Sequence, residues 1–171
     1  MAKLERNRGM FFGSWDGEKW DAIGKDNDEL SKELNPDTES GKNVLGETTF
    51  KQYGYASEID VDPYYMDPDR KMYDHMLEVA LEEKYGEADL LGKFAEAFFT
   101  AVNSATKVMT GYAFVRDAWF VPQSVGGDTS GYAIPYNVMP IGAMVKKGIS
   151  YDMATNIPTF IEWVEPEPSN S

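Results

Sequence analysis

The chain has 171 residues and a formal net charge of −13, with 42% hydrophobic and 13% aromatic residues, no cysteine and a single histidine. Length and apolar content predict one folded domain with a substantial core, while the charge argues against stable binding to a phosphate backbone. The lack of cysteine excludes disulfides and thiolate chemistry. With His75 as the single histidine, most metal sites and most general-base catalytic sites are also excluded. No apolar run approaches the roughly 20 residues of a membrane-spanning helix, which predicts no membrane partner.

The two ends of the chain are expected to lie outside the folded domain. Residues 1–12 hold three basic side chains and one acidic one, opposite in sign to the rest of the chain, and residues 1–14 are assigned to an N-terminal arm. The arm lacks the apolar stretch of a signal peptide, which predicts synthesis and folding in a cytoplasm. A single domain is expected over residues 15–164, and the polar, proline-rich residues 165–171 are expected to form a flexible tail.

Short strands and turns are expected at the start of the domain. Asp16-Gly17 predicts a turn, and residues 19–24 predict a short strand. Residues 26–39 are acidic and polar and end in a turn signal at Asn35-Pro36, so they predict a weak strand followed by a loop.

A β-hairpin is expected next. Residues 44–55 are rich in Thr, Phe and Tyr, and apolar side chains alternate at Ile59 and Val61. This pattern predicts that residues 44–55 pair with residues 57–61 in a hairpin broken near Gly54.

One amphipathic helix of four to five turns is predicted after the hairpin. Asp67 is a favourable N-cap, Pro68 suits the first helical position, and Gly86 is placed to end the helix. The apolar residues that recur at helical spacing between them are Met72, Met76, Leu77, Leu81 and Tyr85.

The second half of the chain is expected to be mostly strand. Residues 112–124 and 132–149 predict strands that a glycine-rich turn at residues 126–131 connects, and residues 158–164 form a final apolar segment. Residues 88–102 are ambiguous, because local propensity alone favours a helix there.

No residue is assigned to a catalytic, cofactor-binding or metal site, and the chain is not expected to be an enzyme. His75 lies on the predicted helix, and no nucleophile elbow accompanies it. The acidic group Asp60, Asp62, Asp67 and Asp69 lacks the Gly and Glu of a calcium loop, and turn formation and helix capping account for Asp62 and Asp67. The turn at residues 126–131 lacks the Lys of a phosphate-binding loop. A glycosidase-like carboxylate pair stays open among the 29 acidic residues, since its members need only meet in space.

Several short sequence motifs occur along the chain in an informative order. These are the strand at residues 20–24, Asn35-Pro36 with residues 43–48, Asp62-Pro63-Tyr64-Tyr65, the Asp67-Pro68 helix start, and Gly127-Asp128-Thr129 before Tyr132. Together they cover about residues 15–160 and resemble the major tail protein, or tail tube protein, of long-tailed bacteriophages and prophages. The resemblance implies an α+β, mainly β fold, a β-sandwich or barrel-like domain with one flanking α-helix. It also favours a strand over residues 93–102.

The resemblance implies a structural role in a virion tail that is assembled in the cytoplasm of the bacterial host. Six subunits would close into a hexameric ring, and rings would stack into a tube that holds the tape-measure protein and conducts DNA at genome ejection without binding it specifically. Tail terminator and distal tail proteins are the other implied partners. An acidic lumen would repel DNA and allow it to slide. Residues 35–43 and 1–12 are the expected ring-to-ring contacts, and residues 44–62 are expected in the inner barrel.

Two alternatives remain open. A monomeric β-sandwich binding module, for example for carbohydrate, would use exposed tyrosine and tryptophan side chains. An acid-dependent hydrolase would lose its activity when one specific carboxylate is replaced. The sequence does not separate a contractile from a non-contractile tail, nor a tube subunit from a related protein at a tail joint.

Overall fold

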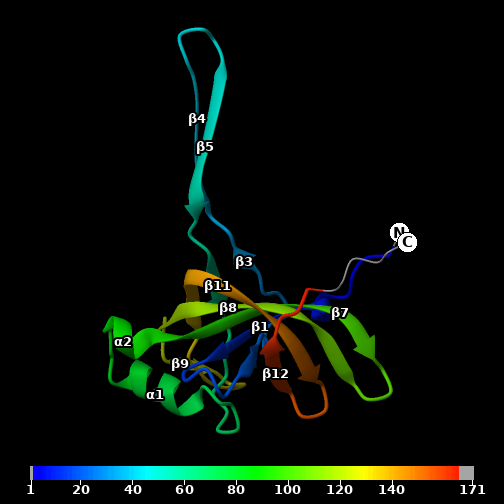
Figure 1. The fold of residues 1–171 in the computed structure, drawn as a ribbon. Coiled ribbons are helices and arrows are strands. Elements are labelled where there is room, and N and C mark those ends of the chain that lie inside the picture. The colour runs from blue at the N-terminus through cyan, green and yellow to red at the C-terminus, as the bar shows by residue number, and fades with distance from the viewer. Residues whose placement is uncertain (1, 166–171) are drawn as a thin grey trace, which may run out of the picture.

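A curled antiparallel sheet of eight strands forms the body of the protein, in a computed structural model that describes residues 2–165 (Figure 1). Across the sheet the order is β2, β1, β7, β8, β11, β6 and β3, and β12 pairs with β11 beside this path. The strands of the sheet are β1 (Gly9–Ser14), β2 (Asp21–Ile23), β3 (Lys32–Glu33), β6 (Glu58–Val61), β7 (Leu91–Asn103), β8 (Val108–Pro122), β11 (Tyr136–Asp152) and β12 (Ile157–Glu162). Two ribbons, β4 (Pro36–Lys42) with β5 (Thr48–Tyr55) and β9 (Gly126–Asp128) with β10 (Gly131–Ala133), and the helices η1 (Arg6–Arg8), α1 (Tyr73–Leu81) and α2 (Glu87–Leu90) complete the described elements.

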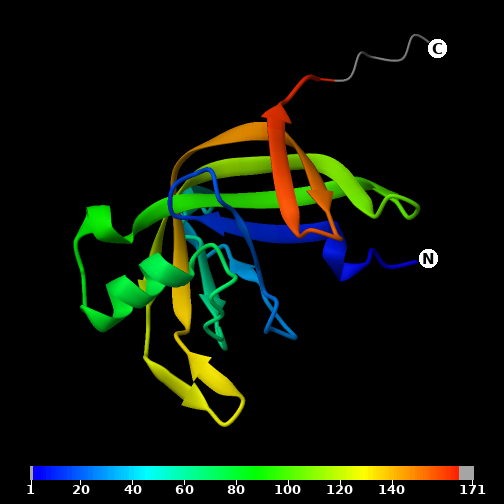
Figure 2. The ribbon, with the colours of Figure 1, turned by 90° about the horizontal axis from the view of Figure 1, so that it is seen from below.

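The long strand β11 makes the sheet curl. Its first half pairs with β6 and its second half with β12, and its register with β8 shifts between Ile141 and Val145. An irregularity of this kind bends a strand and increases its twist. The sheet therefore curls, so that its β2 and β12 edges approach each other across one face (Figure 2). The rings of Trp20 and Phe160 lie 4.8 Å apart there. The prediction of a mainly β, barrel-like fold is confirmed.

Two apolar clusters fill the body. The first lies where α1 covers the sheet, and it includes Ile59, Val61, Met72, Met76, Phe94, Phe120, Ile134 and Tyr136. The second lies inside the curl and includes Phe12, Ala97, Phe99, Met109, Ile149 and Tyr151. Both clusters draw on β7, β8 and β11, so each of these strands buries side chains in both clusters.

The β4–β5 hairpin stands away from the body (Figure 1). Its strands pair only with each other, and every residue of the two strands except Gly54 is exposed. Seven and eight residues at roughly 3.3 Å each give a projection of about 25 Å.

The structure corrects three predictions. Gly9–Ser14 is not part of an arm: it forms β1 between β2 and β7, because Phe12 and Ser14 are fully buried there. Residues 44–55 do not pair with residues 57–61. Instead β5 pairs with β4, which had been expected as a loop, and β6 joins β3 and β11.

The third correction concerns the helix. It begins at Tyr73 and not at Pro68, since Asp67 accepts a bond from the amide of Asp69 and so closes a turn. It ends at Leu81, after which Glu83 adopts a positive φ of 50°. The strand expected over residues 93–102 is confirmed by β7, and the apolar segment at residues 158–164 contains most of β12. Of the predicted C-terminal tail, residues 166–171 lie outside the described residues.

Candidate assembly surfaces

The turn at the end of the hairpin is held by one side chain. We call residues 43–47 the hairpin tip. The Asn43 side-chain oxygen accepts bonds from the amides of Leu45 and Glu47, both at 3.0 Å, and its side-chain amide donates to the Glu47 carboxylate at 2.7 Å. The backbone closes the turn from Gly46 N to Asn43 O and from Asn43 N to Glu47 O. With Gly46 at a φ of 79°, the tip is a pre-organised turn.

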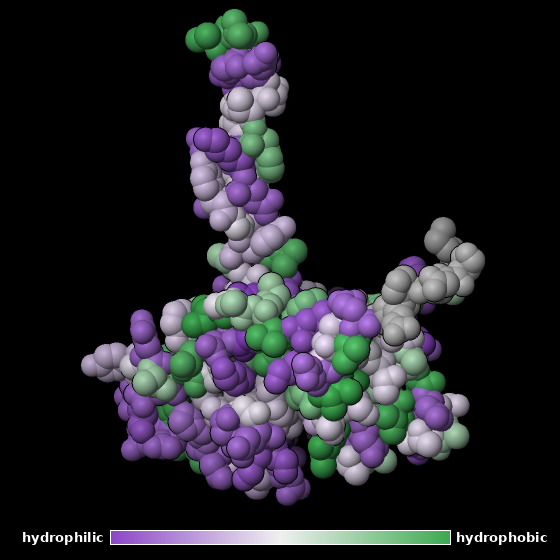
Figure 3. All heavy atoms as spheres, viewed as in Figure 1, coloured by the Kyte–Doolittle hydropathy of each residue, from purple (hydrophilic) through white to green (hydrophobic). Residues whose placement is uncertain are grey.

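The hairpin tip presents apolar side chains to solvent. Val44 is fully exposed and Leu45 is 77% exposed, while the polar atoms of Asn43 and Glu47 bond to each other. Figure 3 shows this apolar end beyond a polar band of the hairpin. The far end of the hairpin therefore exposes a small apolar patch to solvent.

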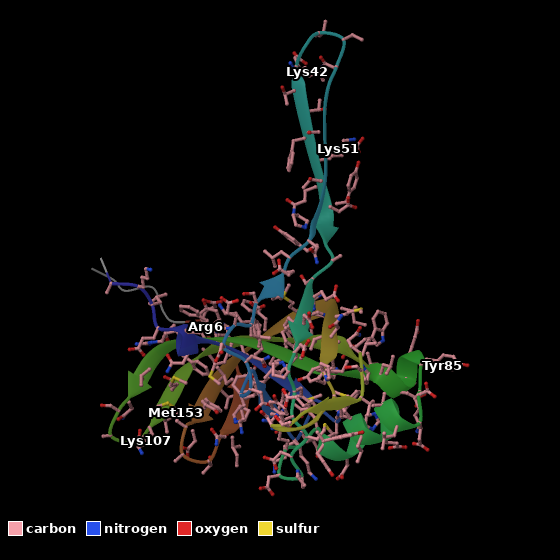
Figure 4. The ribbon with its side chains drawn as sticks, turned by 180° about the vertical axis from the view of Figure 1, so that it is seen from behind. Arg6, Lys42, Lys51, Tyr85, Lys107 and Met153 are labelled. Carbon is pink, nitrogen blue, oxygen red and sulfur yellow. The ribbon has the colours of Figure 1, made fainter. Side chains whose placement is uncertain are left out.

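The shaft of the hairpin also carries unburied aromatic rings. Phe50, Tyr53 and Tyr55 are each more than 60% exposed. The Tyr53 hydroxyl donates to Glu39 across the ribbon at 2.7 Å, which raises the pKa of that phenol. Figure 4 shows Lys42 and Lys51 along the shaft, remote from the body. A two-stranded ribbon that buries nothing is marginally stable in water, which favours a partner that covers it.

The base of the hairpin is fixed to the body. Asn35 receives a backbone bond from the amide of Ala56 at 3.2 Å and donates its side-chain amide to the carbonyl of Ala56 at 3.1 Å. These two bonds hold the ends of the ribbon side by side, so the direction of the hairpin is set by the sheet through β3 and β6.

An open groove lies on the sheet near the start of the hairpin. This sheet groove has a volume of about 850 Å³. β3 and the residues before it form one wall, and β1, β7, β8 and the bulge of β11 form the rest. Its large apolar side chains are Phe11, Leu30, Leu34, Phe98, Tyr112, Phe114 and Met144. Several of them are exposed, including Met144 at 55%, so none of residues 2–165 covers this apolar surface.

The charged groups of the sheet groove are two cations and one anion. Lys32 forms an ion pair with Glu96 in the groove. Arg6 donates to the carbonyls of Gly9 and Leu30 at the rim, and among the described residues it pairs with no carboxylate. The groove is therefore locally positive in a chain of net charge −13.

The residues weighed for chemistry have structural contacts. His75 is partly buried against Trp15, with 4.1 Å between ring centroids, and its Nε2 lies 2.9 Å from the carbonyl of Asp89. Asp60, Asp62, Asp67 and Asp69 are exposed, and Asp67 closes the turn before α1. Within residues 2–165 no group of three or more His, Cys, Asp or Glu side chains could hold a metal ion.

The glycine-rich turn forms the separate β9–β10 ribbon. Asp128 accepts bonds from the amide of Ser130 at 2.8 Å and from the hydroxyl of Tyr65, whose pKa is raised by burial and by this carboxylate. In the part of the chain that the structure describes, no helix is long and apolar enough to cross a membrane.

Sequence reasoning missed both the apolar tip and the sheet groove as surfaces. A signal for the tip was present, because Val44 and Leu45 lie between the turn formers Asn43 and Gly46. The groove had a weaker signal in Leu30 and Leu34, which interrupt an acidic stretch.

No family model matches the chain, and no curated protein matches it in sequence. Among solved structures it is similar to a chain in the cryo-EM structure of the anti-feeding prophage cap, described as a tube-terminating cap. The TM-score is 0.53 with 10% identity, over 85% of this chain and 91% of that chain. At this identity the likeness concerns the fold. The chain therefore shares its fold with a component of a prophage tube-terminating cap.

Proposed function

We propose that this chain is a structural subunit of a phage tail or of a related tail-like tube. The observation that carries the proposal is the fold likeness to a component of a tube-terminating cap, which extends over 85% of the chain. The described residues also show surfaces that suit an assembly: a projecting hairpin with an apolar end and an uncovered apolar groove. A structural subunit, and not an enzyme, is the role that these features support.

In the proposed assembly six subunits form a ring, and rings stack into a hollow tube. Ring closure would pair strand edges that a monomer leaves open, such as that of β12. The hairpin that begins near Asn35, together with the described residues that precede β1, would reach neighbouring subunits. The tube would hold a tape-measure protein and, within a virion tail assembled in a bacterial cytoplasm, conduct DNA.

The strong negative charge supports passage of DNA without binding. A lumen lined by carboxylates repels a phosphate backbone, so DNA would slide through it. Single lumen carboxylates should then be replaceable with little effect on assembly.

The terminator of a tube is a second candidate role, because the similar structure is itself a cap. A terminator would bind tube subunits at one end of the tube. A tube subunit would bind other copies of itself, and at the ends of the tube it would bind a terminator and a distal tail protein. A terminator forms a single ring, whereas a tube subunit stacks indefinitely.

Negative-stain electron microscopy of concentrated protein, beside size-exclusion chromatography, tests the proposal. Long hollow tubes indicate a tube subunit, and isolated six-fold rings indicate a terminator. A strictly monomeric protein that binds a glycan in a screen would instead identify a carbohydrate-binding module.

A further inference from the structure

We infer that the sheet groove of one copy receives the hairpin tip of a second copy of this chain. The inference rests on the proposed function, because it names the contact through which subunits would join. Three observations carry it: the shape and polarity of the tip, its distance from the groove of its own chain, and the charges on the two surfaces.

The hairpin tip has the properties of an anchor. Asn43 fixes the turn in advance, so little conformational freedom is lost when the tip is bound. Val44 and Leu45 project from it without any contact in their own chain that would bury them. Burial of these exposed side chains in an apolar groove is favourable, because it removes apolar surface from water.

The groove of the same chain is out of reach of the tip. The tip lies about 25 Å from the base of the hairpin. The groove is near that base, since Leu34 lines it and Pro36 begins β4. Folding back would break the β4–β5 ladder, so a tip can enter only the groove of another copy.

The charges favour this pairing over other contacts between copies. Two chains of net charge −13 repel each other, so they associate best where local charges are opposite. Glu47 is the only charged side chain of residues 43–47. The groove offers Arg6 at its rim, whose charge is not neutralised by a carboxylate among the described residues, together with the Lys32–Glu96 pair.

Tip and groove are different surfaces, so the contact is heterologous. Each copy uses its tip on one neighbour and offers its groove to another, which produces a closed ring or an open stack and not a symmetric pair. This is the kind of contact that a repeating tube needs.

Disulfide trapping tests the inference directly, because the chain has no cysteine of its own. Leu45→Cys places a thiol on the tip and Met144→Cys places one in the groove, both at exposed positions. The two variants are mixed and treated with a mild oxidant, and the doubly substituted chain is treated in parallel. The control is Leu45→Cys with Tyr85→Cys, since Tyr85 is 92% exposed and Figure 4 shows it at the end of the body opposite Arg6.

We expect a mixed disulfide between the Leu45→Cys and Met144→Cys chains at several times the yield of the control pair. The doubly substituted chain should give a ladder of covalent multimers. A disulfide requires the two Cα atoms to come within about 7 Å, so the ladder reports a specific contact.

The inference fails if rings or tubes form but position 45 links to position 144 no better than to position 85. The proposed tube function would survive that result. A monomeric protein without a ladder would count against both, whereas a ladder without rings or tubes would support the contact and count against the tube.

A second pair of variants separates the contact from folding. Val44→Ser combined with Leu45→Ser should raise the critical concentration for assembly at least tenfold. The melting temperature of the chain should not change. Tyr85→Ser removes exposed apolar surface elsewhere and should leave assembly within twofold of the unmodified chain. Equal effects of the two variants would overturn the inference.

Discussion

Arg70 and Asp26 form an ion pair that holds the loop before α1 against the loop after β2. The distance from Nη1 to Oδ2 is 2.9 Å, and the side chains are only 12% and 18% exposed. Asp26 also accepts a bond from the amide of Tyr65, and the guanidinium lies over the ring of Tyr64 at 4.9 Å. One carboxylate thus fixes both a cation and a backbone amide.

Asp26→Asn should lower the free energy of unfolding by about 2 kcal/mol. The substitution leaves the largely buried guanidinium of Arg70 without its counter-charge, and the cost of such a loss is of that order. Chemical denaturation measures the change. Asp28→Asn is the matched control, because Asp28 is exposed and forms no ion pair among the described residues, and it should cost less than about 0.5 kcal/mol.

The pair should also give the protein a specific acid sensitivity. Burial raises the pKa of Asp26, but the bonds from Arg70 and from the Tyr65 amide outweigh burial and hold the pKa below its usual value of 3.8. Because the pKa of Asp26 is lower in the folded chain than in the unfolded chain, the ionised carboxylate stabilises the fold at pH values above its unfolded pKa. This stabilisation is lost as the pH falls through the pKa of the folded chain. Denaturation curves from pH 6 to pH 2.5 should show the difference between the unmodified chain and Asp26→Asn shrinking below about pH 4. A constant difference over that range would contradict this account.

Gly111→Ala should destabilise the body by about 2–3 kcal/mol. The register of β7 and β8 shifts between Phe99 and Ala101, and a Cβ at Gly111 would lie 2.0 Å from the carbonyl oxygen of Phe98. Because the obstacle is backbone, no side-chain rotation relieves it. Thermal unfolding measures the loss, and Gly9→Ala is the control, since its Cβ would meet nothing closer than 3.9 Å.

Phe160→Ala should cost about 2 kcal/mol, because it removes one side of the contact with Trp20 that closes the curl of the sheet. Ile161 lies next to it on β12 and is 63% exposed, so Ile161→Ala should cost about 0.5 kcal/mol or less. Urea denaturation that ranks Ile161→Ala as the more damaging change would show that the edges of the sheet do not meet in solution.

Replacing residues 36–55 by a short Gly-Ser linker should leave the body folded and abolish assembly. The hairpin strands pair only with each other, and the bonds between Asn35 and Ala56 already hold the cut ends together. We expect a melting temperature within a few degrees of the unmodified chain and no rings or tubes in electron micrographs. Normal tubes from the shortened chain would show that the hairpin is not an assembly element.

The sequence by itself determined much of the local structure. The composition of residues 112–124 and 132–149 predicted strands, and these segments contain most of β8 and β11. Asp62-Pro63 marked the end of β6, and the absence of cysteine and the single histidine limited the chemistry. Such features depend on backbone preferences and side-chain types of neighbouring residues, which a sequence displays directly.

Only the tertiary structure decided which strands pair and where elements begin. Residues 9–14 have no distinctive pattern as a strand, yet burial of Phe12 between β2 and β7 makes them one. Strand β5 pairs with β4 and not with β6. Strand β6 instead pairs with β11, where Ile59 and Val61 are buried in the core. These choices depend on contacts between residues distant in the chain, and so do the two proposed assembly surfaces. An exposed apolar tip and an uncovered groove can be recognised only when the folded body shows what it leaves without a partner.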